Sequence, residues 1–176
     1  MIETLTALIL AGGRSSRMGY DKATIMLDGM SLLDRAIDLA HQAGATSITI
    51  LGRPDHPLGV ADNIQYGGPA RAISAWASGL QKPTQALVIP IDMPLLTPEI
   101  LSLLIKEDSG GYFEGHYLPF TAHVHPGTAP DAQRIQDLLR IFGVRKLTLE
   151  GTLLDKFTNI NDPQALKKLL ALQTRE

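Results

Sequence analysis

The sequence predicts an α/β fold in which a mainly parallel sheet is flanked by helices. Two observations predict it. Short apolar runs at 6–10, 47–51 and 86–91 have the character of buried strands, and the stretches between them carry apolar residues three or four positions apart, as helices do. Strands that alternate with helices form a parallel sheet covered on both faces. Ligands of such sheets bind beyond the C-terminal ends of the strands.

In the first half of the chain, glycine and polar residues mark where each element starts and ends. The strand 6–10 ends in a glycine turn, and a short extended piece is expected at 24–27, closed by a second turn. A near-capping box begins at Ser31, and a helix follows it as far as Gly44, a residue that suits a helix end. The apolar positions of this helix are Leu33, Ala36, Ile37 and Ala40.

Prolines mark the helices of the rest of the chain, because proline suits the first helical position. A helix is expected over 69–80, another begins at Pro98, and a last one is opened by Pro163. Between the last two, 117–124 has the pattern of an extended segment and 130–141 that of a helix. No internal repeat and no linker is evident in the sequence, so we predict a single domain, 1–176.

Composition and charge narrow the class of protein. The 176 residues are 44% hydrophobic and 19% charged, as in globular proteins that bury a core. A formal net charge of -2 is too close to neutral for electrostatic binding to a nucleic acid. The absence of cysteine excludes disulfides, thiolate metal sites and a catalytic thiol. The apolar segment near the N-terminus is too short to cross a membrane, so we predict a cytoplasmic protein without a membrane partner.

The most informative stretch is 8–27, LILAGGRSSRMGYDKATIML. A glycine turn ends the strand, and three cations follow it closely in the sequence: two arginines, among them Arg17, and Lys22. Fixed cations and a backbone that can come close suit a polyphosphate. Lys22 lacks the Ser or Thr that follows a Walker lysine, and the pair Gly12 and Gly13 breaks the dinucleotide pattern G-x-G-x-x-G. A solvated basic loop without a ligand is the alternative.

The same stretch resembles the signature L-A-G-G-x-S-x-R-M-G-x-D-K-A of the molybdenum cofactor guanylyltransferases, matched over 10–23 without a gap. The resemblance implies a three-layer α/β fold of the nucleotide-diphospho-sugar transferase type. It also implies Mg²⁺-dependent transfer of GMP from GTP to the terminal phosphate of molybdopterin carrying molybdenum, with release of pyrophosphate. Three alternatives stay open: a same-fold enzyme with another acceptor, such as a sugar phosphate or a cobinamide phosphate; the use of CTP; and an inactive nucleotide-binding sensor.

Asp92 is the second candidate. It follows a run that should be buried, so its carboxylate is expected at the C-terminal end of a strand, facing the crevice. Mg²⁺ takes hard oxygen ligands, commonly one or two carboxylates together with substrate phosphates. The segment 87–96, LVIPIDMPLL, also resembles the family's metal-binding C-D-x-P stretch, with Ile91 in place of cysteine. We therefore predict Asp92 as the metal ligand; a side chain that caps a turn is the alternative.

Two asparagines form the third candidate. Asn159 and Asn161 alternate, so both amides are expected on one side of an extended segment. The stretch 157–163 resembles the family's F-x-N-x-N-T-P segment, and the resemblance implies a place near the metal and the pterin. Asn161 or Asp162 serving as the N-cap of the last helix is the alternative. Asp162 replaces the family's threonine, and a second acidic group near the metal is a further interpretation of it.

Two other stretches match the family in part. Gly68 fits its G-P-L-A-G-I turn, which borders the nucleotide, but Arg71 stands where the family has alanine. Gly52, directly before Arg53, stands where the family often carries an asparagine that helps to hold the guanine. Glycine has no amide side chain, so backbone groups near 10–12 are expected to read the base instead.

The resemblance implies a role for each candidate. Lys22 is expected at the α-phosphate and Arg17 at the β- and γ-phosphates, while Mg²⁺ on Asp92 bridges phosphate oxygens. The candidate catalytic residues are therefore Arg17, Lys22 and Asp92, with Asp92 as the metal ligand. The candidate nucleotide- and substrate-binding residues are Leu10, Ala11, Gly12, Gly13, Lys22, Gly68, Asn159 and Asn161. GTP and a molybdopterin-type substrate are the predicted partners.

Overall fold

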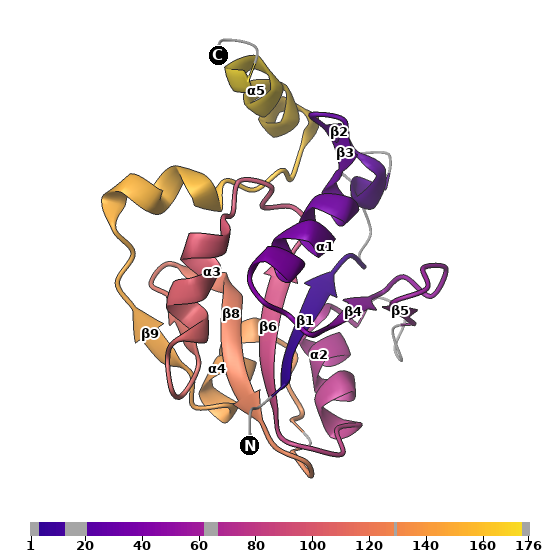
Figure 1. Ribbon diagram of the computed structural model, residues 1–176, viewed down its shortest axis with the longest axis vertical. Helices are drawn as coiled ribbons and strands as arrows, with labels where there is room; N and C mark the ends of the chain where they lie inside the picture. Colours follow the sequence, from indigo (N-terminus) through magenta and orange to yellow (C-terminus); the bar gives the residue numbers. More distant parts are fainter. Residues whose placement is uncertain (1–3, 13–20, 62–66, 129, 174–176) are drawn as a thin grey trace.

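A central sheet of seven strands organises the structure, a computed structural model that describes residues 4–12, 21–61, 67–128 and 130–173 (Figure 1). The strands are β1 (Thr4–Leu10), β4 (Ser47–Leu51), β5 (Gly59–Val60), β6 (Thr84–Pro90), β7 (Gly111–Phe113), β8 (His116–Val124) and β9 (Arg145–Leu147). Their order is β5-β4-β1-β6-β8-β7-β9. β1 pairs in parallel with β4 and β6, whereas β8 is antiparallel to β6 and β7. The predicted mainly parallel sheet is confirmed.

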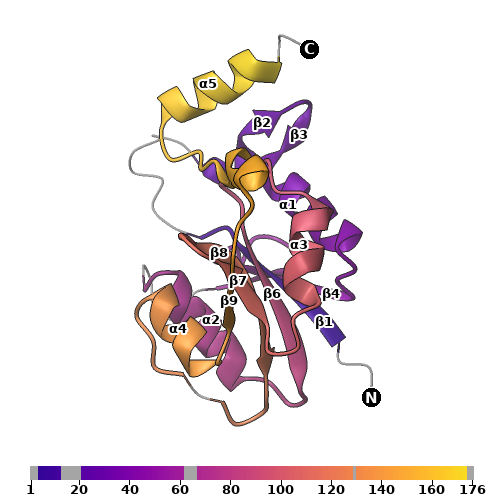
Figure 2. The same cartoon turned by 90° about the vertical axis from the view of Figure 1, so that its left-hand side faces the viewer.

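Helices cover both faces of the sheet, as Figure 2 shows. They are α1 (Leu32–Gln42), α2 (Pro69–Ser78), α3 (Pro98–Ile105), α4 (Ile135–Ile141) and α5 (Pro163–Gln173). Alternate residues of β1 enter two cores, Ala7 and Ile9 on the side of α1 and α3, and Leu8 on the side of α2 and α4. The predicted three-layer fold is confirmed.

Hydropathy along the helices bears on the predicted location. Within the residues that the structure describes, no helix combines the length and the apolar character needed to cross a membrane. The cytoplasmic location stays a prediction.

A hairpin and a capped helix follow directly from local sequence. The hairpin strands are β2 (Met26–Leu27) and β3 (Met30–Ser31). Asp28 and Gly29 turn between them with φ of 52° and 77°, a left-handed conformation that glycine adopts freely and aspartate tolerates. Ser31 Oγ then accepts a hydrogen bond from the Asp34 N–H at 3.0 Å and caps α1. The predicted turn and the predicted helix start are both confirmed.

The structure corrects two predicted helix boundaries. The helix expected over 130–141 begins only at Ile135. Ala132 is buried in the core, so the apolar spacing persists through an irregular segment that precedes the helix. The helix expected over 69–80 ends at Ser78, because a glycine follows as its C-cap.

Several short elements escaped the sequence analysis: β5, β7, β9 and the 3-10 helices η1 (Lys22–Thr24) and η2 (Gly151–Phe157). β5, β7, β9 and η1 have two or three residues each, too few to show a hydrophobic period, and η2 is a 3-10 helix, whose period differs from that of an α-helix. η1 also corrects the extended piece expected at 24–27, which is a strand only from Met26. β7 needs a close approach of two backbones: Gly110 has φ of 78°, and a Cβ there would lie 2.3 Å from the Thr121 carbonyl oxygen.

The segment before α5 closes over the end of β6. Ile160 is fully buried and donates its backbone N–H to the Asp92 carbonyl oxygen at 2.7 Å. The chain then enters α5, which lies beside the β2–β3 hairpin at the top of Figure 1. Residues that follow β1, residues that follow β6 and residues that precede α5 therefore meet at one edge of the sheet.

Candidate functional site

Lys22 is held in place by a single tight turn. Asp21 is the N-cap of η1, and its Oδ1 accepts the Ala23 N–H at 3.0 Å. The Lys22 carbonyl accepts the Ile25 N–H at 3.1 Å, and Ala23 and Ile25 are both buried. Two buried neighbours on a short turn leave the Lys22 side chain to point outward, toward the edge of the sheet.

The Lys22 ammonium contacts two of the other predicted site residues. Its Nζ lies 3.3 Å from Asp92 Oδ2 and 2.9 Å from Asn161 Oδ1. The side chains of Lys22 and Asp92 are 20% and 25% exposed, so the ion pair faces solvent at the sheet edge and is not part of the core. Three residues from distant parts of the chain therefore converge on one point.

The position of Asp92 follows from the end of β6. Pro90 is the last residue of the strand, and the Ile91 N–H donates to the Leu10 carbonyl at 3.4 Å. This bond ties the end of β6 to the end of β1. The Asp92 carboxylate thus emerges beside the residues that follow β1, as the sequence predicted from strand ends alone.

The structure separates the alternatives for the asparagine segment. Asp162 Oδ1 accepts the Ala165 N–H at 2.8 Å, so Asp162 caps α5. The Asn161 amide bonds to Lys22 instead of capping. Asn159 is half-buried and faces a cavity. The sequence suggested an extended strand, but among the described residues the segment pairs with no strand; one backbone bond to Asp92, after β6, and the buried side chain of Ile160 hold it.

The cavity beside Asn159 measures about 460 Å³. It lies between the start of α2, the start of β8 and the start of α4, with Met93 from the loop after β6 in its wall. His116 and Tyr117 supply aromatic surface, and the polar groups include the carboxamides of Gln133, Gln136 and Asn159. Flat heterocycles with several hydrogen-bonding groups suit such a lining.

The residues after β1 adjoin the Lys22 cluster. The Ala11 N–H donates to the Leu51 carbonyl at 3.3 Å, Ala11 is buried, and Gly12 is exposed. Gly68 precedes α2 with φ of 83°, a conformation in which a side chain would be strained. Gly13 and Arg17 lie outside the described residues.

Arg53 is a residue near this cluster to which the sequence analysis assigned no function. Its guanidinium bonds to Asp21, the residue directly before Lys22, and its Nε lies 3.4 Å from Asp55 Oδ1. The hydrogen bond to Asp21 raises the pKa of Arg53 above its ordinary value, more than burial lowers it. The sequence signal was the arginine itself, retained next to Gly52 in the stretch that departs from the family pattern.

The oxygen atoms around Lys22 are candidate ligands for a metal ion. Asp92 and Asn161 offer a carboxylate and an amide oxygen that both contact the Lys22 ammonium, so oxygen donors of the kind that Mg²⁺ prefers lie close together here. Among the described residues no group of three or more His, Cys, Asp or Glu side chains gathers as a metal site. Mg²⁺ commonly uses one or two protein carboxylates together with substrate phosphates. The residues present fit a Mg²⁺ ion that binds together with a nucleotide.

Comparison with known proteins identifies the family. The model of the MobA-like NTP transferase domain matches residues 7–139. The chain belongs to this family. A molybdenum cofactor guanylyltransferase of Xanthomonas euvesicatoria pv. vesicatoria is 28% identical over 94% of both chains. The resemblance inferred from the signature is confirmed, and the chain is a nucleotidyltransferase of the molybdenum cofactor guanylyltransferase type.

Solved structures show the same fold. Molybdopterin-guanine dinucleotide biosynthesis protein A of Archaeoglobus fulgidus superposes with a TM-score of 0.73 and 20% identity, over 97% of this chain and 100% of that one. Rv0371c of Mycobacterium tuberculosis, solved as a complex with manganese, superposes with a TM-score of 0.67 and 16% identity, over 97% and 100% of the two chains. At these identities the likeness concerns the MobA-like fold alone.

Proposed function

We propose that this chain, acting as a single nucleotidyltransferase domain, transfers GMP from GTP to the terminal phosphate of molybdopterin carrying molybdenum and releases pyrophosphate. The observation that carries the proposal is the convergence of Lys22, Asp92 and Asn161 at the C-terminal edge of the sheet. Ligands of parallel sheets bind at this edge, and enzymes that transfer phosphorus groups use a fixed cation and a carboxylate-bound metal ion to neutralise the phosphates.

In this reaction an oxygen of the acceptor phosphate attacks the α-phosphorus of GTP in line. The bond to the bridging oxygen breaks, and its electron pair leaves with pyrophosphate. Little covalent help is needed, so the protein accelerates the step by positioning and by stabilising spread negative charge. The Lys22 ammonium, which contacts Asp92 and Asn161 without nucleotide, faces the α-phosphate. Arg17 and the backbone of Gly12 and Gly13 hold the β- and γ-phosphates.

Asp92 and Asn161 would hold Mg²⁺. Both present oxygen to a common point, and the partial exposure of Asp92 leaves room for substrate phosphates as further ligands. When bound, Mg²⁺ supplies charge neutralisation at the phosphate oxygens. The manganese complex of Rv0371c, a protein of the same fold, supports a divalent ion.

We assign the guanine to the exposed backbone after β1. The Ala11 N–H and the Leu10 carbonyl both bond to neighbouring strands, so Gly12 is the residue of this group best placed to meet the base. Glycine leaves room for the wider purine. We assign the start of α2, which follows Gly68 and its positive φ, to the other side of the nucleotide.

The cavity beside Asn159 supports a pterin as the acceptor. Its aromatic wall and its carboxamides match a flat ring that carries amide and amino groups. Asn159 would contact the pterin ring, while Asn161 keeps its contact with the Lys22 ammonium.

Transfer of label from α-³²P-GTP tests the proposal. Molybdopterin, sugar phosphates and cobinamide phosphate are offered as acceptors, with CTP and ATP as competing donors. We expect labelled product from GTP and molybdopterin alone, and only when Mg²⁺ is present. A preference for CTP would contradict the guanylyl assignment, transfer to another acceptor would contradict the pterin, and GTP binding without transfer would favour the inactive sensor.

A further inference from the structure

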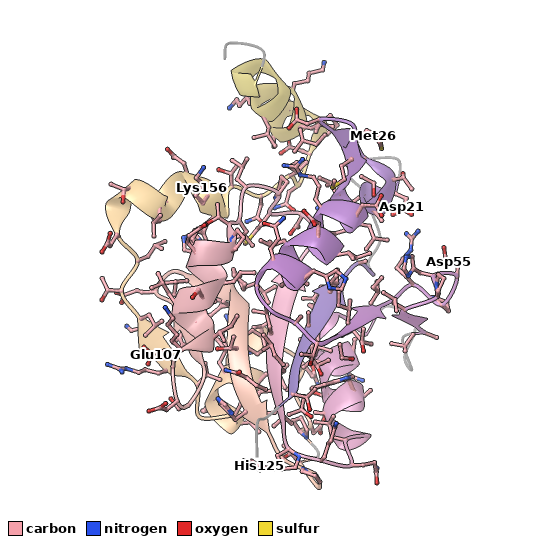
Figure 3. All side chains as sticks on the ribbon, in the orientation of Figure 1. Asp21, Met26, Asp55, Glu107, His125 and Lys156 are labelled. Atoms are coloured by element: carbon pink, nitrogen blue, oxygen red, sulfur yellow. The ribbon has the colours of Figure 1, made fainter. Side chains whose placement is uncertain are left out.

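Arg53 joins two segments that border the nucleotide region. It follows β4, and its guanidinium bonds to Asp21 at the start of η1 and contacts Asp55 on its own loop. Figure 3 labels Asp21, on the turn η1 at the upper right, and Asp55, on the loop at the far right, so both lie on the same side of the molecule. The Arg53 side chain is 19% exposed and that of Asp21 is 43% exposed, so the guanidinium is mostly covered while its partner carboxylate faces solvent.

The loop after β4 fixes the backbone of Arg53. Its N–H donates to the Val60 carbonyl at 3.2 Å, and its carbonyl accepts the His56 N–H at 3.1 Å. A Cβ at Gly59 would lie 1.6 Å from the Arg53 carbonyl oxygen, so any side chain at Gly59 would displace Arg53. The guanidinium is therefore anchored at its base.

Asp21 uses both carboxylate oxygens. Oδ1 accepts the Ala23 N–H and holds the η1 turn, while Oδ2 accepts from Arg53. The Asp21 carbonyl also accepts the Thr24 N–H at 3.2 Å and the Thr24 hydroxyl at 2.9 Å. The residue between these anchors is Lys22, so the direction of its ammonium depends on where Asp21 is held.

We propose that Arg53 is a positioning residue for Lys22, which it acts on through Asp21. A three-residue 3-10 turn has little stability of its own, so its orientation depends on what holds it: buried Ala23 and Ile25 on one side and the bond from Arg53 to Asp21 on the other. Arg53 supplies its anchor from a loop whose backbone is held by hydrogen bonds to Val60 and His56. The inference rests on the proposed transition-state role of Lys22. A shift of about 1 Å in such a group costs up to about a hundredfold in rate.

The planar fork of arginine suits this task. Arg53 meets Asp21 and Asp55 at once, with different nitrogen atoms. Lysine would keep the positive charge but offers a single flexible ammonium, so it cannot hold both carboxylates in one geometry. Arg53→Lys is therefore the conservative variant that separates charge from geometry.

The test compares Arg53→Ala and Arg53→Lys with Arg145→Ala, which removes a bridge to Glu107 of 3.1 Å at the far edge of the sheet. Initial rates in the transfer assay give kcat and KM for GTP. We expect kcat to fall about tenfold to a hundredfold in Arg53→Ala, with a smaller change in KM, and Arg53→Lys to recover part of the loss. Arg145→Ala should match the wild type.

Chemical labelling provides a measurement that needs no turnover. Acetylation of the folded protein, followed by peptide mass spectrometry, reports the reactivity of each lysine. Lys22 should react several-fold faster in Arg53→Ala, because its ammonium leaves Asp92 and Asn161. Lys146, which pairs with Glu114 at 2.7 Å, is the internal reference and should not change. This assay decides the inference even if the proposed acceptor is wrong.

A double mutant separates positioning from general stability. If Arg53 acts through Lys22, Arg53→Ala should change kcat little in a Lys22→Ala background. Asp21→Asn keeps a good N-cap and weakens the partner of Arg53, so it should reproduce the faster labelling of Lys22 even if Arg53→Ala fails to fold.

Three results would overturn the inference: unchanged labelling of Lys22 in folded Arg53→Ala and Asp21→Asn, a rate loss fully additive with that of Lys22→Ala, or a changed preference between GTP and CTP. The last would make Arg53 a base-reading residue.

Discussion

The two halves of the sheet encode their chemistry differently. We assign the nucleotide to β5, β4, β1 and β6 with the loops after them, called the nucleotide half below; its candidate site residues follow strand ends, Lys22 after β1 and Asp92 after β6. We assign the acceptor to β8, β7, β9, α4 and the segment 158–161, called the acceptor half below; its cavity is lined by side chains of irregular segments and short elements. A phosphate-binding site needs a closely approaching backbone and positive side chains at fixed positions, so it leaves a recognisable pattern in the sequence. Binding a heterocycle constrains mainly the shape and polarity of the lining, which many sequences can supply.

Among the proposed variants, Asp92→Ala should have the largest effect on turnover. The residue is partly exposed at a strand end, so the melting temperature should stay close to that of the wild type. Turnover should fall on the order of a hundredfold or more, because a main charge stabiliser is lost. Initial rates across a Mg²⁺ titration check this, with exposed Asp108→Ala as the matched control. Near-normal Mg²⁺-dependent activity would remove Asp92 from the site.

Lys22→Ala and Arg17→Ala should affect different kinetic constants, because we assign the two cations to different phosphates of GTP. Lys22→Ala should depress kcat more than tenfold while KM for GTP changes less, because we assign the ammonium to the transition state. Arg17→Ala should weaken GTP binding as well, since it holds groups present in the ground state. Steady-state kinetics and calorimetric GTP titrations measure both, and equal values in all three proteins would show that the loop after β1 does not bind the nucleotide.

Asn159→Ala should weaken binding of the acceptor and leave binding of the nucleotide unchanged. Loss of one buried hydrogen bond, about 1.4 kcal/mol, corresponds to roughly a tenfold higher KM for molybdopterin. KM for GTP should not change. Asn161→Ala is the matched variant and should lower kcat instead, because its amide contacts Lys22. The same kinetic profile in both variants would contradict the division of the two asparagines.

Gly12→Ala should have the smallest effect, a change in the preference between GTP and CTP. A methyl group beside the base takes space that the purine needs, and one methylene in a pocket is worth about 1 kcal/mol or somewhat more. GTP should therefore lose about fivefold in kcat/KM relative to CTP. Competition between the two donors measures the ratio. A ratio that stays constant would place the base elsewhere.

Some features of the fold could be predicted from the sequence because they are local. The cap at Ser31, the turn at Asp28 and Gly29, and the starts of the helices at prolines depend on neighbouring residues only. The irregular segment before Ile135 could not be predicted, because buried Ala132 gives it the same apolar spacing as a helix. Short strands such as β9 gain their definition from pairing with β7, and the sequence carries no signal for that pairing.

By itself, the sequence determined the α/β order, the signature after β1, and the candidates Lys22, Asp92 and Asn161, since each depends on residue type and spacing along the chain. Only the tertiary structure decided which of these side chains meet. Lys22 contacts partners 70 and 139 residues away, and Arg53 reaches Asp21 across the ends of two strands. Contacts at such separations depend on strand register and on the packing of buried residues such as Ile160, because those alone bring distant strand ends to one edge.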